Sequence, residues 1–196
     1  MNLIPVKTPD DIPSRGRGKW DLDVFCWKKL CSEFQPKSIL ELGTGRGLFL
    51  SSVMPLLPDS IAVTVNAPLG QKTGGKFTTF DIPGDEIGEF FRGQDYASRI
   101  EQVWSLTKDM MSKLEGRSFD FIHIDASHSK DEVVRDSKNA KELLNPGGVI
   151  VWHDVHPGIP EPWINEVYEA LEELQTNGII GDVNWFLRSW VAFARF

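Results

Sequence analysis

Residues 38–50 read SILELGTGRGLFL, and the rest of the chain is arranged around them. An apolar run, three alternating glycines and a second apolar run are typical of a buried strand, a tight turn and the start of a helix. Glycine is needed in such a turn because the backbone bends sharply and approaches a ligand closely, where a Cβ atom would be in the way. The spacing is G-x-G-x-G, which differs from the G-x-G-x-x-G of dinucleotide-binding loops.

The run from Glu41 to Gly47, directly after the apolar strand, resembles the first motif of class I S-adenosylmethionine-dependent methyltransferases. S-adenosylmethionine carries no phosphate, and its sulfonium and amino groups are cations that suit an acid such as Glu41. The resemblance covers about residues 37–66 and 98–196 and implies an α/β fold: a Rossmann-like, doubly wound sheet of seven strands, mostly parallel, with an antiparallel terminal hairpin strand. It also implies a set of cofactor-binding residues, namely Glu41, Gly43, Thr44, Gly45, Asn66, Ser105, Leu106 and Asp125. For the glycine loop taken alone, the alternative is a tight turn in another kind of α/β protein.

Length and composition are those of a globular protein with one domain. The chain has 196 residues, of which 41% are hydrophobic and 25% charged, so it is long enough to bury a sizeable core. The net charge of −7 and the lack of a long basic run argue against nucleic-acid binding. No apolar stretch is long enough for a membrane helix, and the N-terminus lacks the apolar core of a secretory signal. Cys26 and Cys31 lack metal-ligand spacing and are expected to be partly buried thiols in a reducing, cytoplasmic compartment.

Two segments outside the resemblance are expected to flank the site. Residues 1–19 contain three prolines and two glycines and are interpreted as an extended N-terminal arm. Its basic residues Arg15, Arg17 and Lys19 either cover an anionic part of the substrate or are simply solvated. Residues 67–97 are rich in glycine and are interpreted as an insertion over the active-site face or as a surface loop, with a short helix at residues 85–93.

The remaining elements follow from apolar periodicity and from glycine and proline. We predict helices at residues 21–34, 109–114, 127–144 and 162–175, and strands at residues 61–65, 100–104, 119–125, 148–154, 178–187 and 190–196. Asp21 is expected to be the N-cap of the first helix, and Met110, Met111 and Leu114 are expected to lie in the core. Asn66 stands where the family usually has an acid that binds both ribose hydroxyls, and an amide is a poorer acceptor for that pair. By the same resemblance, the end of the strand at residues 100–104 lies against the adenine.

Two acids follow neighbouring strands of the predicted sheet. The strand–helix–strand sequence from residue 119 to residue 154 forms a right-handed crossover, so both strands end at the edge that holds the glycine loop. Because adjacent strands lie roughly 5 Å apart, Asp125 and Asp154 are expected to point into one site. Two carboxylates this close repel each other unless a divalent cation or a proton lies between them.

All the histidines of the chain, His156 included, fall at the ends of the same two strands. His123 shares a strand face with Asp125 and is expected to be a structural histidine with satisfied hydrogen bonds. His128 lies just past the strand end and is the best-placed general base. His153 would face away from Asp154 if the strand continued through both residues.

The segments Asp125-Ala-Ser-His128 and His153-Asp154 resemble paired motifs of small O-methyltransferases, such as those acting on macrolide sugars and aminocoumarins. The resemblance implies that Asp125, His128 and Asp154 are catalytic, with His128 taking a proton from the substrate hydroxyl. It also implies a divalent metal such as Mg²⁺ on Asp125 and Asp154, with His153 as a further ligand where the family commonly has a second acid. Imidazole favours softer metals, so metal dependence stays open. The structural alternative for Asp154 is a hydrogen bond to the loop after its strand.

Together these patterns favour S-adenosylmethionine-dependent methyl transfer to a hydroxyl oxygen of a small-molecule acceptor, with or without a divalent metal. The alternative from a different class is a non-catalytic S-adenosylmethionine- or nucleotide-binding module that regulates a partner. A nicotinamide-dependent oxidoreductase is disfavoured by the glycine spacing and by the missing ribose acid. We expect neither a nucleic-acid nor a membrane partner, whereas the acceptor and any homo-oligomer cannot be read from the sequence.

Overall fold

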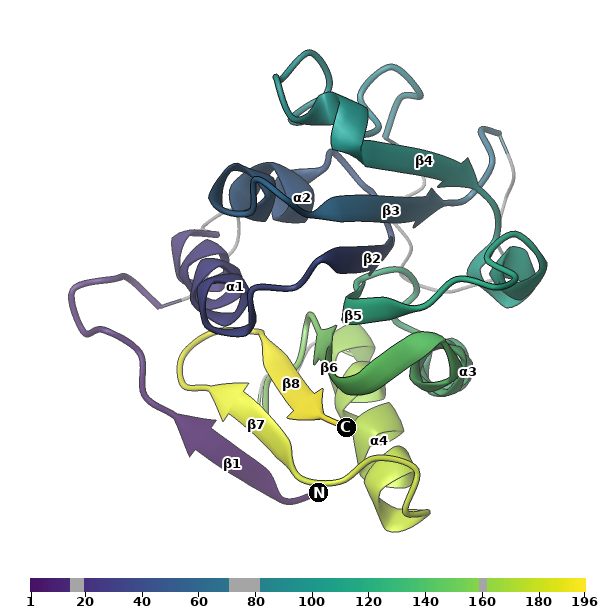
Figure 1. The fold of residues 1–196 in the computed structure, drawn as a ribbon. Helices are drawn as coiled ribbons and strands as arrows, with labels where there is room; N and C mark the ends of the chain where they lie inside the picture. The colour runs from purple at the N-terminus through teal and green to yellow at the C-terminus, as the bar shows by residue number, and fades with distance from the viewer. Residues whose placement is uncertain (15–19, 71–81, 159–161) are drawn as a thin grey trace.

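The structure is a computed structural model that describes residues 1–14, 20–70, 82–158 and 162–196. Its centre is a sheet of eight strands in the order β1-β7-β8-β6-β5-β2-β3-β4 (Figure 1). The strands are β1 (Leu3–Val6), β2 (Ser38–Leu42), β3 (Ile61–Asn66), β4 (Ile100–Trp104), β5 (Phe119–Ile124), β6 (Leu144–Trp152), β7 (Val183–Phe186) and β8 (Ala192–Arg195). Neighbouring strands are parallel except at β8, which runs antiparallel to both β6 and β7. The predicted Rossmann-like α/β sheet with an antiparallel terminal hairpin strand is confirmed.

The sheet has one strand more than predicted, because part of the N-terminal arm forms β1 at its edge. β1 pairs in parallel with β7, with Leu3 opposite Val183 and Val6 opposite Phe186. Pro5 argued for a loop, but an edge strand tolerates proline because one side of its backbone makes no ladder hydrogen bonds. The basic cluster at residues 15, 17 and 19 lies outside the described residues.

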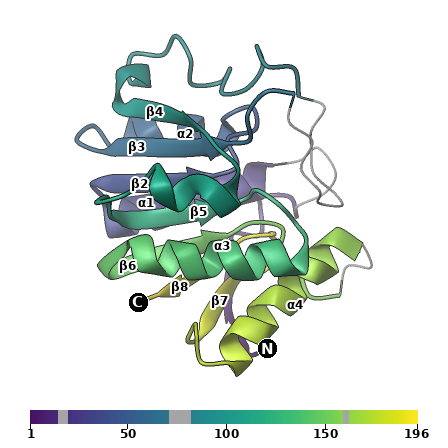
Figure 2. The same ribbon diagram turned by 90° about the vertical axis from the view of Figure 1, so that its right-hand side faces the viewer.

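Helices cover both faces of the sheet (Figures 1 and 2). The α-helices among the described residues are α1 (Asp21–Phe34), α2 (Leu48–Val53), α3 (Lys130–Leu143) and α4 (Pro162–Thr176), and 3-10 helices lie at Met54–Leu56, Ala97–Arg99 and Thr107–Ser112. Ile39 of β2 joins the apolar cluster beneath α1 and α2, whereas Leu40 and Leu42 join the cluster beneath α3 and α4. Because both faces are covered, β2 is apolar on both sides, which accounts for the continuous apolar run in the sequence. Within the described residues, no helix is long and apolar enough to cross a membrane.

Two predicted element ends differ from the structure near the site. Asp21 is the first residue of α1, and the N-cap position is held by Trp20. The helix predicted at residues 127–144 is shortened to α3, because Leu144 already belongs to β6. The pairing of β5 with β6 shifts in register between Phe119 and Phe121, and Gly147 at φ +81° lets the extra residues of β6 bulge. The glycines expected to end this helix therefore shape the start of the next strand.

Two short helices were also predicted with the wrong geometry. Residues 107–112 form a 3-10 helix, although Met110 and Leu114 are fully buried and Met111 packs against the core, as predicted. Residues 85–93 form successive turns, because Gly88 takes φ +70° and a left-handed residue interrupts a right-handed helix.

Candidate functional site

A cavity of about 930 Å³ is lined by the residues that directly follow β2, β3, β4, β5 and β6. The carboxyl ends of these parallel strands lie along one edge of the sheet, which is where open α/β sheets bind ligands. The lining includes every site residue predicted from the sequence: Glu41, Gly43, Thr44, Gly45, Asn66, Ser105, Leu106, Asp125, His128, His153 and Asp154. The topology therefore brings together residues that are distant along the chain.

The glycine loop forms one wall of the cavity, and its glycines are needed for different reasons. Gly43 has φ +97°, and a Cβ atom there would lie 1.9 Å from the backbone oxygen of Asp125. This close approach packs the end of β5 against the loop and sets Asp125 beside it. Gly45 has φ +49°, and among the described residues only Ile82 Cδ1, at 4.0 Å, would come near a Cβ atom there. The loop thus leaves room for a ligand at Gly45 and holds the end of β5 at Gly43.

Beneath the loop lies a row of buried polar groups that includes Glu41, which is 2% exposed. The Thr64 hydroxyl on β3 donates to Glu41 Oε2 at 2.6 Å, and the hydroxyl oxygens of Thr44 and Thr64 lie 2.8 Å apart. Gln102 on β4 donates to the Thr44 hydroxyl at 3.0 Å. Burial raises the pKa of the Glu41 carboxyl well above its usual range, against the opposing effect of the Thr64 hydrogen bond. Sequence reasoning missed Thr64 and Gln102, although a hydroxyl inside the apolar strand at residues 61–65 indicates a buried partner.

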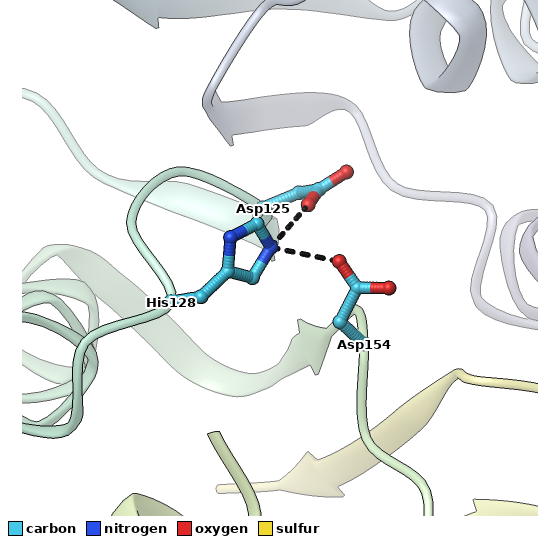
Figure 3. Close-up of side chains that lie close together, drawn as sticks. All are labelled: Asp125, His128 and Asp154. Atoms are coloured by element: carbon cyan, nitrogen blue, oxygen red, sulfur yellow. Dashed lines mark hydrogen bonds and ion pairs between the residues drawn. The ribbon is translucent and has the colours of Figure 1, made fainter. Parts of the chain in front are cut away.

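Asp125, His128 and Asp154 meet where β5 and β6 end (Figure 3). His128 Nε2 lies 2.7 Å from Asp154 Oδ2 and 3.8 Å from Asp125 Oδ1. Burial lowers the pKa of His128, but its interactions with the nearby acids Asp125 and Asp154 outweigh burial and raise the pKa to about 10. In the protein alone this imidazole is therefore protonated at neutral pH. One ligand atom from each of the three residues lies within 4.8 Å of the others, a spacing at which a metal ion could be held.

His153 lies under the same two carboxylates. β6 ends at Trp152 and Asp154 has φ +58°, so strand alternation stops and both His153 and Asp154 face Asp125. His153 Nδ1 is 3.3 Å from Asp125 Oδ2 and 3.5 Å from Asp154 Oδ2. Burial lowers the pKa of His153, but the charges of Asp154 and Asp125 raise it well above its usual range. From the sequence, His153 was expected to face away from Asp154 only if the strand continued through both residues. Because β6 ends before them, this does not happen.

A third carboxylate, Asp23 on α1, contacts His153 from the other side and was missed by sequence reasoning. Asp23 is fully buried, its Oδ2 lies 3.1 Å from His153 Nε2, and its Oδ1 accepts a hydrogen bond from the backbone N–H of Trp190 at 3.0 Å. The sequence did indicate that Asp23 is buried, because helical spacing places it on the same face as Cys26, Trp27 and Leu30, all of which are buried. An acid within an apolar helix face needs a buried partner.

The other two histidines form no ion pair with a carboxylate among the described residues. His123 is buried and stacks on Phe49 with ring centroids 4.2 Å apart, as expected of a structural histidine. Its hydrogen bonds are not satisfied as predicted, because neither ring nitrogen has a partner among the described residues. Burial lowers the pKa of His123 to about 3, so its ring is neutral at physiological pH. His156 packs against Trp185 with ring centroids 5.3 Å apart and is not among the residues that line the cavity.

Further lining residues come from α1, from its N-cap residue and from the segment at residues 67–97. Trp20 and Trp27 line the cavity, and Trp20 stacks on His153 with ring centroids 5.8 Å apart. Ile82 and Phe90 line it as well, and the backbone N–H of Phe90 donates to the carbonyl of Arg46 in the glycine loop at 3.0 Å. Residues 71–81 of this segment lie outside the described residues.

Comparisons with known proteins agree with the fold. A family model described as a methyltransferase domain matches residues 40–155. The O-methyltransferase from Bacillus cereus, solved in complex with SAH, is 17% identical, with a TM-score of 0.63 over 90% of this chain and 81% of that chain. SAH-bound PaMTH1 from Podospora anserina is 20% identical, with a TM-score of 0.66 over 89% of this chain and 78% of that chain. TomG from Streptomyces achromogenes, an O-methyltransferase solved with SAM, is 20% identical, with a TM-score of 0.61 over 94% of this chain and 80% of that chain. No curated protein matches the chain, and at these identities the structural likeness concerns the fold.

Proposed function

The chain belongs to the family of methyltransferase domains, and we propose that it transfers a methyl group from S-adenosylmethionine to a hydroxyl oxygen of a small molecule. The observation that carries this proposal is that Asp125 contacts both the glycine loop and the acid–histidine cluster. Its backbone packs against Gly43 of the glycine loop, and its carboxylate lies within 3.8 Å of His128 and 3.3 Å of His153. A cofactor on the loop and an acceptor oxygen at the acid–histidine cluster would therefore be neighbours, which is the alignment that methyl transfer needs.

The cavity suits S-adenosylmethionine in size and in chemistry. Its volume of about 930 Å³ falls in the range of about 300–1,000 Å³ that is usual for small-molecule sites. Gly45 leaves the loop open to a ligand, and Glu41 offers a carboxylate to the cationic groups of the cofactor. We assign Asn66 to the ribose and the strand end at Ser105 and Leu106 to the adenine. When bound, S-adenosylmethionine supplies a methyl group on a sulfonium that is already a good leaving group.

We assign removal of the acceptor proton to His128. Its hydrogen bond to Asp154 at 2.7 Å fixes the ring at the end of the cavity formed by β5 and β6. Because its pKa is about 10 in the protein alone, His128 must lose a proton before it can accept one from a hydroxyl. Positive charge near Asp125 and Asp154 favours that loss.

Two cations could neutralise the carboxylates of Asp125 and Asp154, and both would lie between these two side chains. Asp125 and Asp154 fit a divalent metal as oxygen donors, with Nδ1 of His153 as a third donor, and such a metal would supply positive charge that favours loss of the proton from His128. The protonated ring of His153, with Nδ1 3.3 Å and 3.5 Å from the two carboxylates, can instead neutralise them without a metal. Metal assistance therefore remains part of the proposal to be measured.

The test is a thermal shift with S-adenosylhomocysteine, with NAD⁺ as the control ligand, each in EDTA and in added Mg²⁺. A ligand at a hundred times its Kd stabilises a protein by about 2.7 kcal/mol, which is a rise in Tm of roughly 5–10 °C at this chain length. A shift with S-adenosylhomocysteine supports the proposal, and dependence of a subsequent transfer assay on Mg²⁺ supports metal assistance. A shift with NAD⁺ alone, or none with either ligand, contradicts it. Binding of S-adenosylhomocysteine without transfer to any hydroxylated acceptor would favour the regulatory-module alternative.

A further inference from the structure

A continuous line of hydrogen bonds runs from Gln102 on β4 through Thr44 of the glycine loop and Thr64 on β3 to Glu41 on β2. Gln102 Nε2 lies 3.0 Å from Thr44 Oγ1, Thr44 Oγ1 lies 2.8 Å from Thr64 Oγ1, and Thr64 Oγ1 lies 2.6 Å from Glu41 Oε2. Thr44 and Thr64 are 3% and 0% exposed, so water does not compete for these bonds. The line ends on the carboxylate that we assign to the cationic end of the cofactor.

The direction of every bond in this line follows from its two ends, which are the Gln102 amide and the Glu41 Oε2 atom that accepts from the Thr64 hydroxyl. Gln102 Nε2 also lies 3.2 Å from the backbone carbonyl of Thr64, which can only accept, so this end of the amide is the NH₂ donor. Each threonine hydroxyl has one proton. Thr44 therefore accepts from Gln102 and donates to Thr64, and Thr64 donates to Glu41. All the donors point towards Glu41, and Glu41 Oε2 is an acceptor.

We propose that Gln102, Thr44 and Thr64 are positioning residues that hold the Glu41 carboxylate as an acceptor, in one orientation, for the cationic amino-acid end of S-adenosylmethionine. This inference rests on the proposed function. Burial raises the pKa of the Glu41 carboxyl and favours its neutral form, whereas the hydrogen bond donated by Thr64 opposes this effect and favours the charged form that attracts a cation. Hydrogen bonds aligned head to tail also polarise and strengthen one another. Because Thr44 belongs to the glycine loop, the same line ties the loop to the acid.

The ligands that test this inference differ at the end that Glu41 would bind. S-adenosylhomocysteine has the cationic amino group, whereas 5′-methylthioadenosine has the same adenosine and sulfur but no amino-acid part. A loss of positioning at Glu41 should therefore weaken the first ligand and spare the second. A general loss of structure should weaken both.

The first pair of variants is Thr64→Val, which removes the hydroxyl at nearly constant volume, and Thr64→Ser, which keeps it. By titration calorimetry at constant pH, we expect Thr64→Val to weaken S-adenosylhomocysteine about tenfold or more, since hydrogen bonds to charged groups are worth at least that much. We expect 5′-methylthioadenosine to bind within about twofold of wild type, and Thr64→Ser to restore most of the affinity for S-adenosylhomocysteine. The Tm of each ligand-free variant reports any loss of stability separately.

The second pair tests the direction of the bonds and serves if Thr64→Val does not fold. Gln102→Glu replaces the donor with an acceptor of the same shape and opposes the direction of the line, whereas Gln102→Met removes the donor without supplying an acceptor. We expect a loss of about tenfold or more for S-adenosylhomocysteine in the first variant and a clearly smaller loss in the second. If wild type binds S-adenosylhomocysteine and Thr64→Val and Gln102→Glu bind it equally well, or if both ligands weaken alike, the inference is wrong. If wild type itself does not bind S-adenosylhomocysteine, the proposed function fails first.

Discussion

Asp154 illustrates how one backbone angle assembles the acid–histidine cluster. At φ +58° it ends the alternation of β6, so its carboxylate reaches His128 at 2.7 Å while the preceding His153 still faces Asp125. A non-glycine residue in the left-handed region is uncommon and carries strain, and such residues gather at functional sites. Side-chain chemistry and backbone geometry therefore both point to this residue.

Asp154→Asn keeps the size of this side chain and removes its charge. We expect methyl transfer to an acceptor that wild type accepts to fall by roughly 100-fold or more, because general-base catalysis by His128 depends on its hydrogen-bonded orientation. Affinity for S-adenosylhomocysteine should stay nearly unchanged, because the loop, Glu41 and Asn66 are untouched. Initial rates and calorimetry measure the two quantities, with Asp131→Asn, an exposed acid on α3, as the control. Loss of ligand binding in a folded Asp154→Asn protein would contradict the assignment.

His123 provides a prediction about pH that is independent of any ligand. Burial lowers its pKa from 6.5 to about 3, so between these values the unfolded chain binds one proton more than the folded protein. Stability must then fall as pH falls through this window, by about 1.4 kcal/mol per pH unit. His123→Phe removes this proton and can still stack on Phe49.

When the pH is lowered from 7.5 to 5, we expect the free energy of unfolding of His123→Phe to increase by about 2 kcal/mol relative to that of wild type. Urea unfolding at the two pH values measures the difference. An identical pH dependence in the two proteins would show that His123 is solvated or paired in solution.

At the level of elements, two glycines of the turn between β2 and α2 have different roles. At Gly43 the missing side chain lets the end of β5 approach, whereas at Gly45 it leaves space at the cavity. Glycine spacing alone indicated a turn and a ligand, and it did not distinguish these two positions. The structure distinguishes them, because a Cβ atom at Gly43 would lie 1.9 Å from the backbone oxygen of Asp125, whereas one at Gly45 would lie 4.0 Å from Ile82 Cδ1.

A matched pair of alanine variants separates these two roles. Gly43→Ala places a Cβ on the backbone of Asp125, which cannot move without shifting β5, so we expect a loss of more than about 4 kcal/mol of stability. Gly45→Ala meets no backbone among the described residues, so we expect a folded protein that loses about 1–2 kcal/mol to its left-handed angle and binds S-adenosylhomocysteine weakly. Thermal unfolding and calorimetry measure both. Equal stability of the two variants would contradict the packing role of Gly43.

At the scale of the whole molecule, the cavity and the N-terminal strand are largely independent. β1 closes the sheet beyond β7, and the N-terminus is tied to α4 by hydrogen bonds from Met1 to Glu172 and from Asn2 to Gln175. No residue between 1 and 14 is among those that line the cavity. Stability and ligand binding should therefore respond differently to loss of this strand.

Removal of residues 1–7 should lower the Tm by roughly 5–10 °C, because Met1, Leu3 and Val6 are partly buried against the core and lose part of the about 1.5–3 kcal/mol that full burial of such a side chain is worth. It also exposes β7 as an edge strand, so self-association at high concentration is expected. Affinity for S-adenosylhomocysteine should remain that of wild type. Thermal unfolding, size-exclusion chromatography and calorimetry measure these effects, with Lys7→Ala as the control. A loss of ligand affinity would show that the arm reaches the site.

The amino-acid sequence was enough to predict the order of the elements apart from β1, and the edge of the sheet at which the site forms. Apolar runs, the glycine loop and the strand–helix–strand crossover are local patterns, and parallel strands must bring their ends to one side. For this reason Glu41, Asp125, His128 and Asp154 were placed at one cavity without coordinates.

The contacts between distant groups could be seen only in the folded structure. Asp23 reaches His153 from 130 residues away, and Gln102 reaches Thr44 from 58 residues away, so no local pattern specifies either contact. The edge strand β1 likewise depends on a free backbone at β7. These contacts exist because the packing of helices and strands fixes the distances between segments. They could not be predicted because sequence periodicity describes only the face on which each residue lies.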